Sequence, residues 1–286
     1  MTIRAIVFDV DGTLAETEDL HRRSFNEAFA EHGLDWNWDR PLYTQLLGIA
    51  GGRERIIAYA RMMGRQVDAD GLHQRKTELY NRTIQEGAIA LRPGVAALID
   101  RARRKHLSLA IGTTTSRPNV VSLLKSTLGG EALRVFASIR TGEEVGAKKP
   151  DPEVYRLVLS DLGLSGPECV CVEDSRNGLL AARGASMRTV ITPSQFTCHE
   201  DFSGADLILR NLAMPWSSPE FQPFTSLMDQ PVDLCRLLAH GGQSLAQGPR
   251  RHLRCCGGGA PNRLSVNRRE AWGLRLRWQT ALHRRG

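Results

Sequence analysis

The stretch Ile6-Val7-Phe8-Asp9-Val10-Asp11-Gly12-Thr13 joins an apolar run to a polar turn. The apolar run is typical of the end of a buried strand, and Asp-Gly is a common turn pair. Residues two apart on a strand share a face, so the two carboxylates converge on one pocket. Such a pair is costly unless a cation or a protonation step uses it. We therefore interpret Asp9 and Asp11 as a catalytic pair, with a plain polar turn as the alternative.

Three further segments place polar side chains after apolar runs. Thr113 and Thr114 follow the run 107–111, Lys149 lies in Lys148-Lys149-Pro150-Asp151-Pro152, and Glu173-Asp174 end the run that starts at Cys169. Taken singly, each has an ordinary explanation: a strand-end threonine, a solvated lysine or a helix N-cap. Because phosphate sites in parallel sheets lie at the carboxyl ends of strands, the segments together indicate one shared site.

The residue types suit phosphoryl chemistry. One carboxylate can attack phosphorus and bind a metal, and the other can protonate the leaving oxygen and then activate water. A phosphate monoester is a dianion, so an attacking Asp9 brings negative charges together. Magnesium is a hard ion that takes oxygen ligands, and Lys149 would stabilise charge on the transferring group. The sequence therefore predicts a Mg²⁺ cofactor.

In this order, the four segments resemble the haloacid dehalogenase-like phosphohydrolases. The resemblance implies that Asp9 is the nucleophile and a metal ligand. It implies that Asp11 is the general acid/base, with its backbone carbonyl on the metal. Thr113 matches the phosphate-binding residue, and Lys149 matches the lysine that supports the phosphoryl group.

The same resemblance assigns the acidic pair to the metal site. Asp174 is expected to bind the metal directly, and Glu173 is expected either to bind it or to lie just behind it.

Alternating strand-like and helix-like runs over residues 1–14 and 90–213 predict an α/β core domain: a parallel, Rossmann-like sheet with helices on both faces. Beyond the runs already named, strands are expected at 188–191 and 207–209, and helices at 93–106, 118–128, 152–162 and 177–185. Residues 15–89 lack strand signals and predict helices at 18–30, 53–63 and 72–84. This insertion is interpreted as a helical cap domain that closes over the site.

A closer resemblance covers about residues 1–212. The segments Ala15-Glu16-Thr17-Glu18, Gly51-Gly52-Arg53-Glu54-Arg55 and Thr113-Thr114-Thr115 are similar to those of CbbY-type proteins of Calvin-cycle bacteria, which are in turn similar to β-phosphoglucomutases. That type implies a sugar-phosphate phosphatase acting on xylulose-1,5-bisphosphate. The candidate substrate contacts are Glu16, His21, Arg55, Lys76 and Thr114.

Residues 214–286 have a different composition. They hold eleven arginines, no lysine and four acidic residues, which accounts for the whole formal net charge of +7. We interpret this basic tail as disordered, with a nucleic-acid-binding arm as the alternative. The alternatives for the whole chain are a phosphosugar mutase and a nucleic-acid-binding protein that acts through the tail.

Composition excludes several classes. No run approaches the roughly 20 apolar residues of a membrane span. The chain enters a strand almost at its first residue, which leaves no room for a secretory signal, and its six cysteines lack a disulfide spacing. We expect a cytoplasmic monomer whose partner is a small sugar phosphate.

Overall fold

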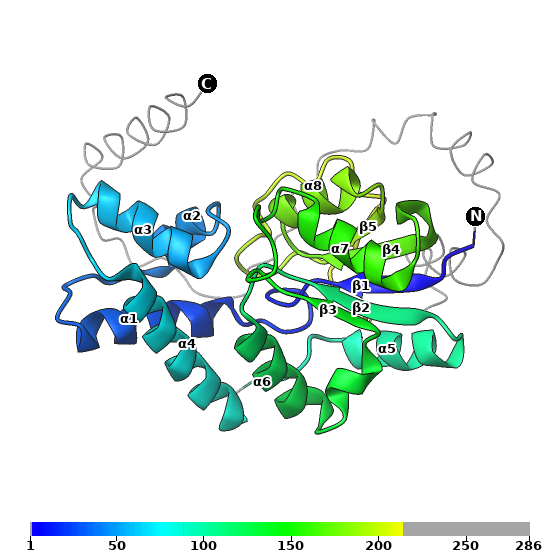
Figure 1. Cartoon of the computed structure of the whole chain (residues 1–286), viewed down its shortest axis with the longest axis horizontal. Coiled ribbons are helices and arrows are strands. Elements are labelled where there is room, and N and C mark those ends of the chain that lie inside the picture. The colour runs from blue at the N-terminus through cyan, green and yellow to red at the C-terminus, as the bar shows by residue number, and fades with distance from the viewer. Residues whose placement is uncertain (1, 88, 214–286) are drawn as a thin grey trace, which may run out of the picture. The chain divides into compact units, whose positions relative to one another are not determined.

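The computed structural model describes residues 2–87 and 89–213, so the predicted tail lies outside the described residues. Within the described residues, the central sheet (Figure 1) has six strands, all parallel, in the order β3-β2-β1-β4-β5-β6. The strands are β1 (Ala5–Phe8), β2 (Ser108–Gly112), β3 (Ser138–Arg140), β4 (Cys169–Glu173), β5 (Arg188–Ile191) and β6 (Leu207–Ile208). The predicted parallel α/β fold is confirmed.

Helices cover both faces of the sheet, as Figure 1 shows. Side chains alternate along β1: Ile6 and Phe8 pack with α5 (Val95–Arg104) and α6 (Arg117–Leu128). Ala5 and Val7 pack with α7 (Glu153–Leu162) and α8 (Arg176–Gly184) on the other face. A strand buried on both faces needs a continuous apolar run, which explains the sequence of β1.

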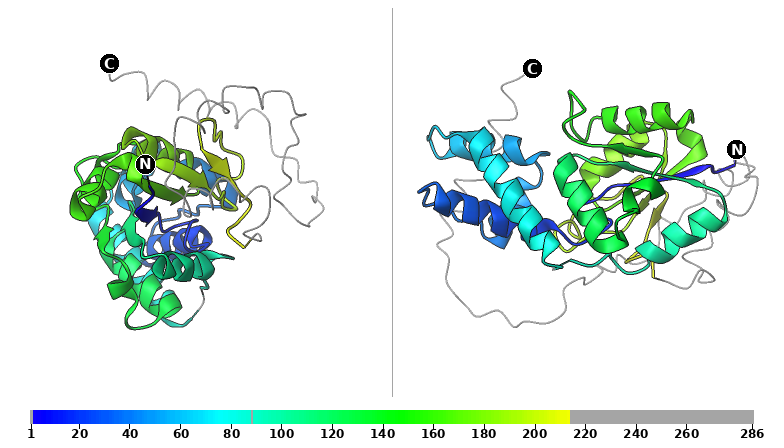
Figure 2. Two further views of the ribbon diagram at one scale, coloured as in Figure 1. Left: turned by 90° about the vertical axis from the view of Figure 1, so that its right-hand side faces the viewer. Right: turned by 60° about the horizontal axis from the view of Figure 1, so that its bottom comes forward.

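Four helices are inserted between β1 and α5: α1 (Glu18–Glu31), α2 (Arg40–Leu46), α3 (Gly52–Met62) and α4 (Ala69–Gln85). They gather at one end of the sheet (Figure 2). An aromatic cluster joins α1, α2 and α3, with Phe25 and Phe29 each 4.8 Å from Trp38 between ring centroids. Helix α4 also reaches the core, where the Ser126 hydroxyl of α6 donates to the Ile84 carbonyl over 3.0 Å.

Two elements were not predicted. Helix α2 has only seven residues, and its N-cap is Asp39, whose side chain accepts from the Leu42 amide over 2.8 Å. Strand β3 has three residues, and Ile139 is its one apolar member. Single turns of 3₁₀ helix, η1 (Ala132–Val135) and η2 (Gly166–Glu168), precede β3 and β4. Such short elements carry too few residues to show a periodicity.

A search of the described helices for a long apolar stretch finds none that could cross a membrane.

Candidate active site

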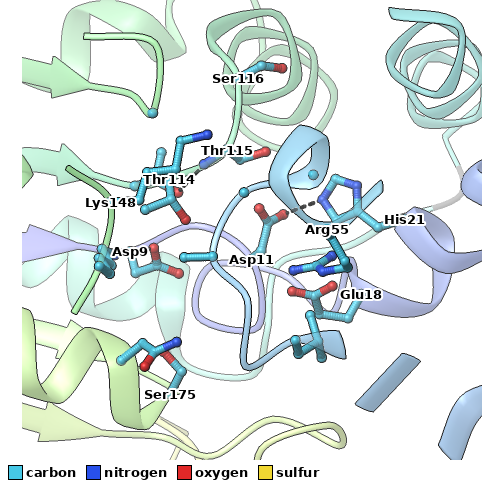
Figure 3. Close-up of a pocket in the computed structure, with 18 of the residues that line it drawn as sticks. Asp9, Asp11, Glu18, His21, Arg55, Thr114, Thr115, Ser116, Lys148 and Ser175 are labelled. Carbon is cyan, nitrogen blue, oxygen red and sulfur yellow. Dashed lines mark hydrogen bonds and ion pairs between the residues drawn. The ribbon is translucent and has the colours of Figure 1, made fainter. Parts of the chain in front are cut away.

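A cavity opens where the carboxyl ends of β1, β2 and β4 meet the four inserted helices. Nine of the predicted site residues line it: Asp9, Asp11, His21, Arg55, Lys76, Thr113, Thr114, Lys149 and Asp174. The other two, Glu16 and Glu173, do not. Figure 3 shows that the labelled side chains come from both the sheet end and the helices above it. The predicted motifs therefore do converge at one edge of the sheet.

The turn after β1 aims its two carboxylates into this cavity. The Asp9 amide donates to the Val172 carbonyl over 3.0 Å, which continues the β1–β4 pairing by one residue. Gly12 then adopts a left-handed conformation with φ of +79°, and a Cβ atom there would overlap the Asp174 carboxylate. Glycine is thus required both by the backbone angle and by the close approach of an acidic side chain.

Asp9 lies against a buried ammonium group. Lys149 Nζ donates to Asp9 Oδ1 over 2.6 Å, to Glu173 Oε1 over 2.6 Å and to the Gly112 carbonyl over 2.9 Å. Burial and the negative charges of Glu173 and Asp11 raise the pKa of Asp9 to about 8, although Lys149 opposes that rise. Lys149 therefore neutralises the carboxylate that the sequence predicts as the nucleophile, but only in part.

Three buried carboxylates, those of Asp9, Glu173 and Asp174, offer ligand atoms that all lie within 4.8 Å of one another. Burial, together with the charges of Glu173 and Asp9, raises the pKa of Asp174 well above its usual range. A single ammonium cannot balance three crowded anions, and hard oxygen ligands at this spacing fit Mg²⁺. The residues present therefore fit the predicted metal.

Asp11 has a different environment. Its Oδ1 accepts from the Thr17 hydroxyl over 2.6 Å and lies 2.9 Å from His21 Nε2 (dashed in Figure 3). His21 Nδ1 lies 2.6 Å from Lys76 Nζ. The contacts therefore run from Asp11 through His21 on α1 to Lys76 on α4. Burial favours the protonated acid, but the charge and hydrogen bond of His21 and the bond from Thr17 hold the pKa of Asp11 well below its usual range.

Two predicted substrate contacts have protein partners instead. Arg55 is buried and donates to the carbonyls of Leu46, at the end of α2, and of Ile49, in the following segment, over 3.0 and 3.2 Å. It therefore links α3 to the end of α2 while it lines the cavity. Glu16 forms an ion pair of 3.0 Å with buried Arg92, outside the cavity. Glu18, two residues later, does line the cavity.

Thr113 and Thr114 lie between β2 and α6. The Thr113 amide donates to the Arg140 carbonyl over 3.0 Å, which extends the pairing of β2 with β3. The Thr113 hydroxyl accepts from the Thr115 amide over 3.3 Å. Ser116, the N-cap of α6, also lines the cavity, so the helix start faces the same space as the threonines.

Several cavity residues were missed by the sequence reading. Lys148 Nζ lies 2.8 Å from both carboxylate oxygens of Glu54, so it joins the loop before α7 to α3. His73, one turn before Lys76 on α4, has a pKa lowered to about 4 by burial and by the charges of Lys76 and Lys148. Residues three apart on a helix share a face. The position of His73, three residues before Lys76 on the helix expected at 72–84, was therefore the signal that could have found it.

Comparison with known proteins identifies the family. A model of the haloacid dehalogenase-like hydrolases matches residues 3–186. "Protein CbbY" from Cereibacter sphaeroides is 48% identical over 214 residues, covering 74% of this chain and 93% of that protein. A crystal structure of a CbbY variant from Rhodobacter sphaeroides, in complex with xylulose-1,5-bisphosphate, is 46% identical with a TM-score of 0.72 and covers 74% of this chain and 96% of that one.

A third similarity concerns the fold alone. A β-phosphoglucomutase from Clostridium difficile is 19% identical with a TM-score of 0.67, and the match covers 79% of this chain and 97% of that one. Together these findings confirm the predicted resemblance and the prediction of an enzyme of the phosphatase class. The chain belongs to the haloacid dehalogenase-like hydrolases.

Proposed function

We propose that this protein is a Mg²⁺-dependent phosphatase of a sugar bisphosphate, with xylulose-1,5-bisphosphate as the first candidate. The observation that carries the proposal is the pairing of buried Asp9 with Lys149 inside a group of three carboxylates. The candidate substrate rests on the relative whose crystal structure holds that sugar bisphosphate. Residues 15–89 would act as a cap over the core formed by 1–14 and 90–213.

The first half-reaction joins Asp9 to the phosphoryl group. A carboxylate oxygen of Asp9 attacks phosphorus, the bond from phosphorus to the sugar oxygen breaks, and Asp11 gives that oxygen a proton. In the second half, Asp11 takes a proton from water as the water oxygen attacks phosphorus, which frees Asp9 and releases inorganic phosphate. Lys149 stays beside Asp9 throughout and offsets the negative charge there.

Asp9, Asp174 and the backbone carbonyl of Asp11 would hold the metal, with the carboxylate of Glu173 in the same group. Bound Mg²⁺ supplies positive charge that lets an anionic nucleophile approach an anionic phosphate.

Asp11 needs a proton before it can act as an acid, yet its contacts favour the ionised form. Thr17 and His21, which make those contacts, both belong to the proposed cap side. The protonation of Asp11 therefore depends on how the cap is positioned. A substrate that shifts His21 away from Asp11 would raise the pKa of that carboxyl and let it carry the proton.

Phosphate release from xylulose-1,5-bisphosphate tests the proposal. We expect turnover with Mg²⁺, loss of turnover in excess chelator and recovery when Mg²⁺ is restored. Calcium should support the reaction weakly because its larger, looser coordination shell misplaces the attacking oxygen. Full activity in excess chelator would contradict the metal-dependent mechanism. An isomerised sugar phosphate as the main product, without inorganic phosphate, would favour a mutase instead.

A further inference from the structure

The carboxylate of Glu173 is fully occupied by protein donors. Its Oε1 accepts from Lys149 Nζ over 2.6 Å and from the Tyr155 hydroxyl. Its Oε2 accepts from the Asp174 amide over 3.2 Å and from the Ser175 hydroxyl over 3.4 Å. An ionised carboxylate has about four acceptor positions, and these four donors use them. Glu173 is also 1% exposed and, unlike Asp9 and Asp174, does not line the cavity.

Tyr155 contacts both Glu173 and Lys149. It lies in the first turn of α7, fully buried beneath the site, and its ring centroid is 4.7 Å from Lys149 Nζ. The backbone approaches both Tyr155 and Glu173 closely. A Cβ atom at Gly112 would overlap the Tyr155 ring, and one at Gly178 would overlap the Glu173 carboxylate.

The Tyr155 hydroxyl keeps its proton. A tyrosine hydroxyl ordinarily loses its proton only at about pH 10, so Tyr155 is a donor throughout the neutral range. The same side chain therefore offers an aromatic face to Lys149 and a hydrogen bond to Glu173.

We propose that Tyr155 is a positioning residue: its hydroxyl holds the Glu173 carboxylate turned toward Lys149 and away from the metal. Glu173 then serves as the partner that fixes the Lys149 ammonium beside Asp9, and the metal is held by Asp9 and Asp174 without it. This inference rests on the proposed function, because it assigns Tyr155 a part in the same phosphoryl transfer.

A variant that lacks only the hydroxyl oxygen separates the hydrogen bond of Tyr155 to Glu173 from the contact of its ring with Lys149. Tyr155→Phe keeps the ring over Lys149 and the packing of α7, and it deletes only the donor to Glu173. The freed Oε1 position makes Glu173 a better metal ligand and loosens Lys149. We expect Mg²⁺ binding to tighten while the chemical step slows, and a merely structural role for Tyr155 would not produce these opposite signs.

The experiment measures both quantities. Calorimetric titration of the substrate-free enzyme with Mg²⁺ gives Kd, and phosphate release from the sugar bisphosphate gives kcat and KM. For Tyr155→Phe we expect kcat about tenfold or more below wild type, as for a lost hydrogen bond to a charged group, with KM within about threefold. Its Kd for Mg²⁺ should fall about threefold or more. Tyr59→Phe, which removes a hydroxyl from the aromatic cluster of the inserted helices, is the matched control and should change neither value.

A second pair of variants decides the question if Tyr155→Phe does not fold. Glu173→Gln should weaken Mg²⁺ binding at least tenfold less than Asp174→Asn does. Of these two residues, only Asp174 is a direct ligand in this proposal. Equal weakening by the two variants would overturn it, as would a Tyr155→Phe enzyme with wild-type kcat and Kd. The Mg²⁺ titration needs no substrate. An inactive wild type would therefore refute the proposed function and leave the positioning role to be judged by Kd alone.

Discussion

At the scale of single residues, Asp9 and Asp11 show how two carboxylates two positions apart acquire different properties. Asp9 is buried among other acids with one ammonium partner, and its pKa is raised to about 8. The Asp11 carboxylate lies against His21 and accepts a hydrogen bond from Thr17, and these contacts lower its pKa. A metal bound among the three carboxylates would hold Asp9 ionised. Movement of His21 away from Asp11 would let Asp11 take up a proton.

We predict that the effect of Asp11→Asn depends on the leaving group. The amide cannot donate the proton that a sugar oxygen needs, but an aryl oxygen leaves without one. The variant should lose about 10²-fold or more in kcat on a sugar phosphate and much less on an aryl phosphate, as steady-state phosphate release would show. Equal losses on the two esters would remove Asp11 from this role.

Sequence reasoning found the residue types at this scale more reliably than their partners. Nine of the proposed site residues do line the cavity. Local sequence does not distinguish Glu16 from Glu18, which lie on the same short segment. Glu16 pairs with the buried Arg92 outside the cavity, whereas Glu18 lines it. Tyr155 could not be recognised from the sequence, because its proposed role depends on a contact of helix α7 with Glu173, 18 residues later on strand β4.

At the scale of elements, the inserted helices contribute several side chains to the cavity, among them Arg55. Arg55 lines the cavity while it donates to the carbonyl at the end of α2 and to one in the segment that follows. If it also meets a second phosphate, Arg55→Ala should lower kcat/KM for a sugar bisphosphate by about ten- to a hundredfold, because a charge-assisted contact is lost. A small monophosphate should be affected far less. Arg53→Ala, which removes an exposed arginine paired with Asp70, is the control.

Parallel losses of kcat/KM on both substrates would show that Arg55 serves the structure of the helices rather than the second phosphate.

Lys76, on α4, is a buried cation, and its burial disfavours the charged form. It is 4% exposed, and burial lowers its pKa to about 7 although Asp11 and Glu18 favour the charged form. The folded protein therefore binds fewer protons than the unfolded chain between about pH 7 and pH 10.5, so this residue makes stability rise with pH across that window.

Lys76→Met should remove that rise. An apolar side chain of similar length avoids the desolvation of the ammonium, so we expect the variant to be more stable at pH 7 by at least about 1 kcal/mol, or about 2–4 °C in Tm. Turnover should fall, since the contact with His21 is lost. Thermal unfolding from pH 6 to 10 measures this, with the exposed Lys125→Met as control. A Tm that still rises with pH as in wild type would contradict the assignment to Lys76.

At the scale of the molecule, the parallel sheet and its active edge were predictable because each long element repeats one simple pattern. The buried runs before Asp9 and Glu173 became β1 and β4, and the expected strand at 188–191 matches β5. The pieces that escaped prediction, β3 and α2, are held by neighbours rather than by their own periodicity. The same applies to the aromatic cluster around Trp38, which combines residues from three helices and a loop.

The central claim is that Asp9 of this fold attacks a sugar phosphate. Its most direct test is steady-state phosphate release from xylulose-1,5-bisphosphate with Mg²⁺, comparing wild type with Asp9→Asn at matched circular dichroism. The substitution keeps the shape of the side chain but removes the attacking charge and a metal ligand. We predict turnover by wild type and none measurable above background for Asp9→Asn. Substantial phosphate release by the folded variant would contradict the account.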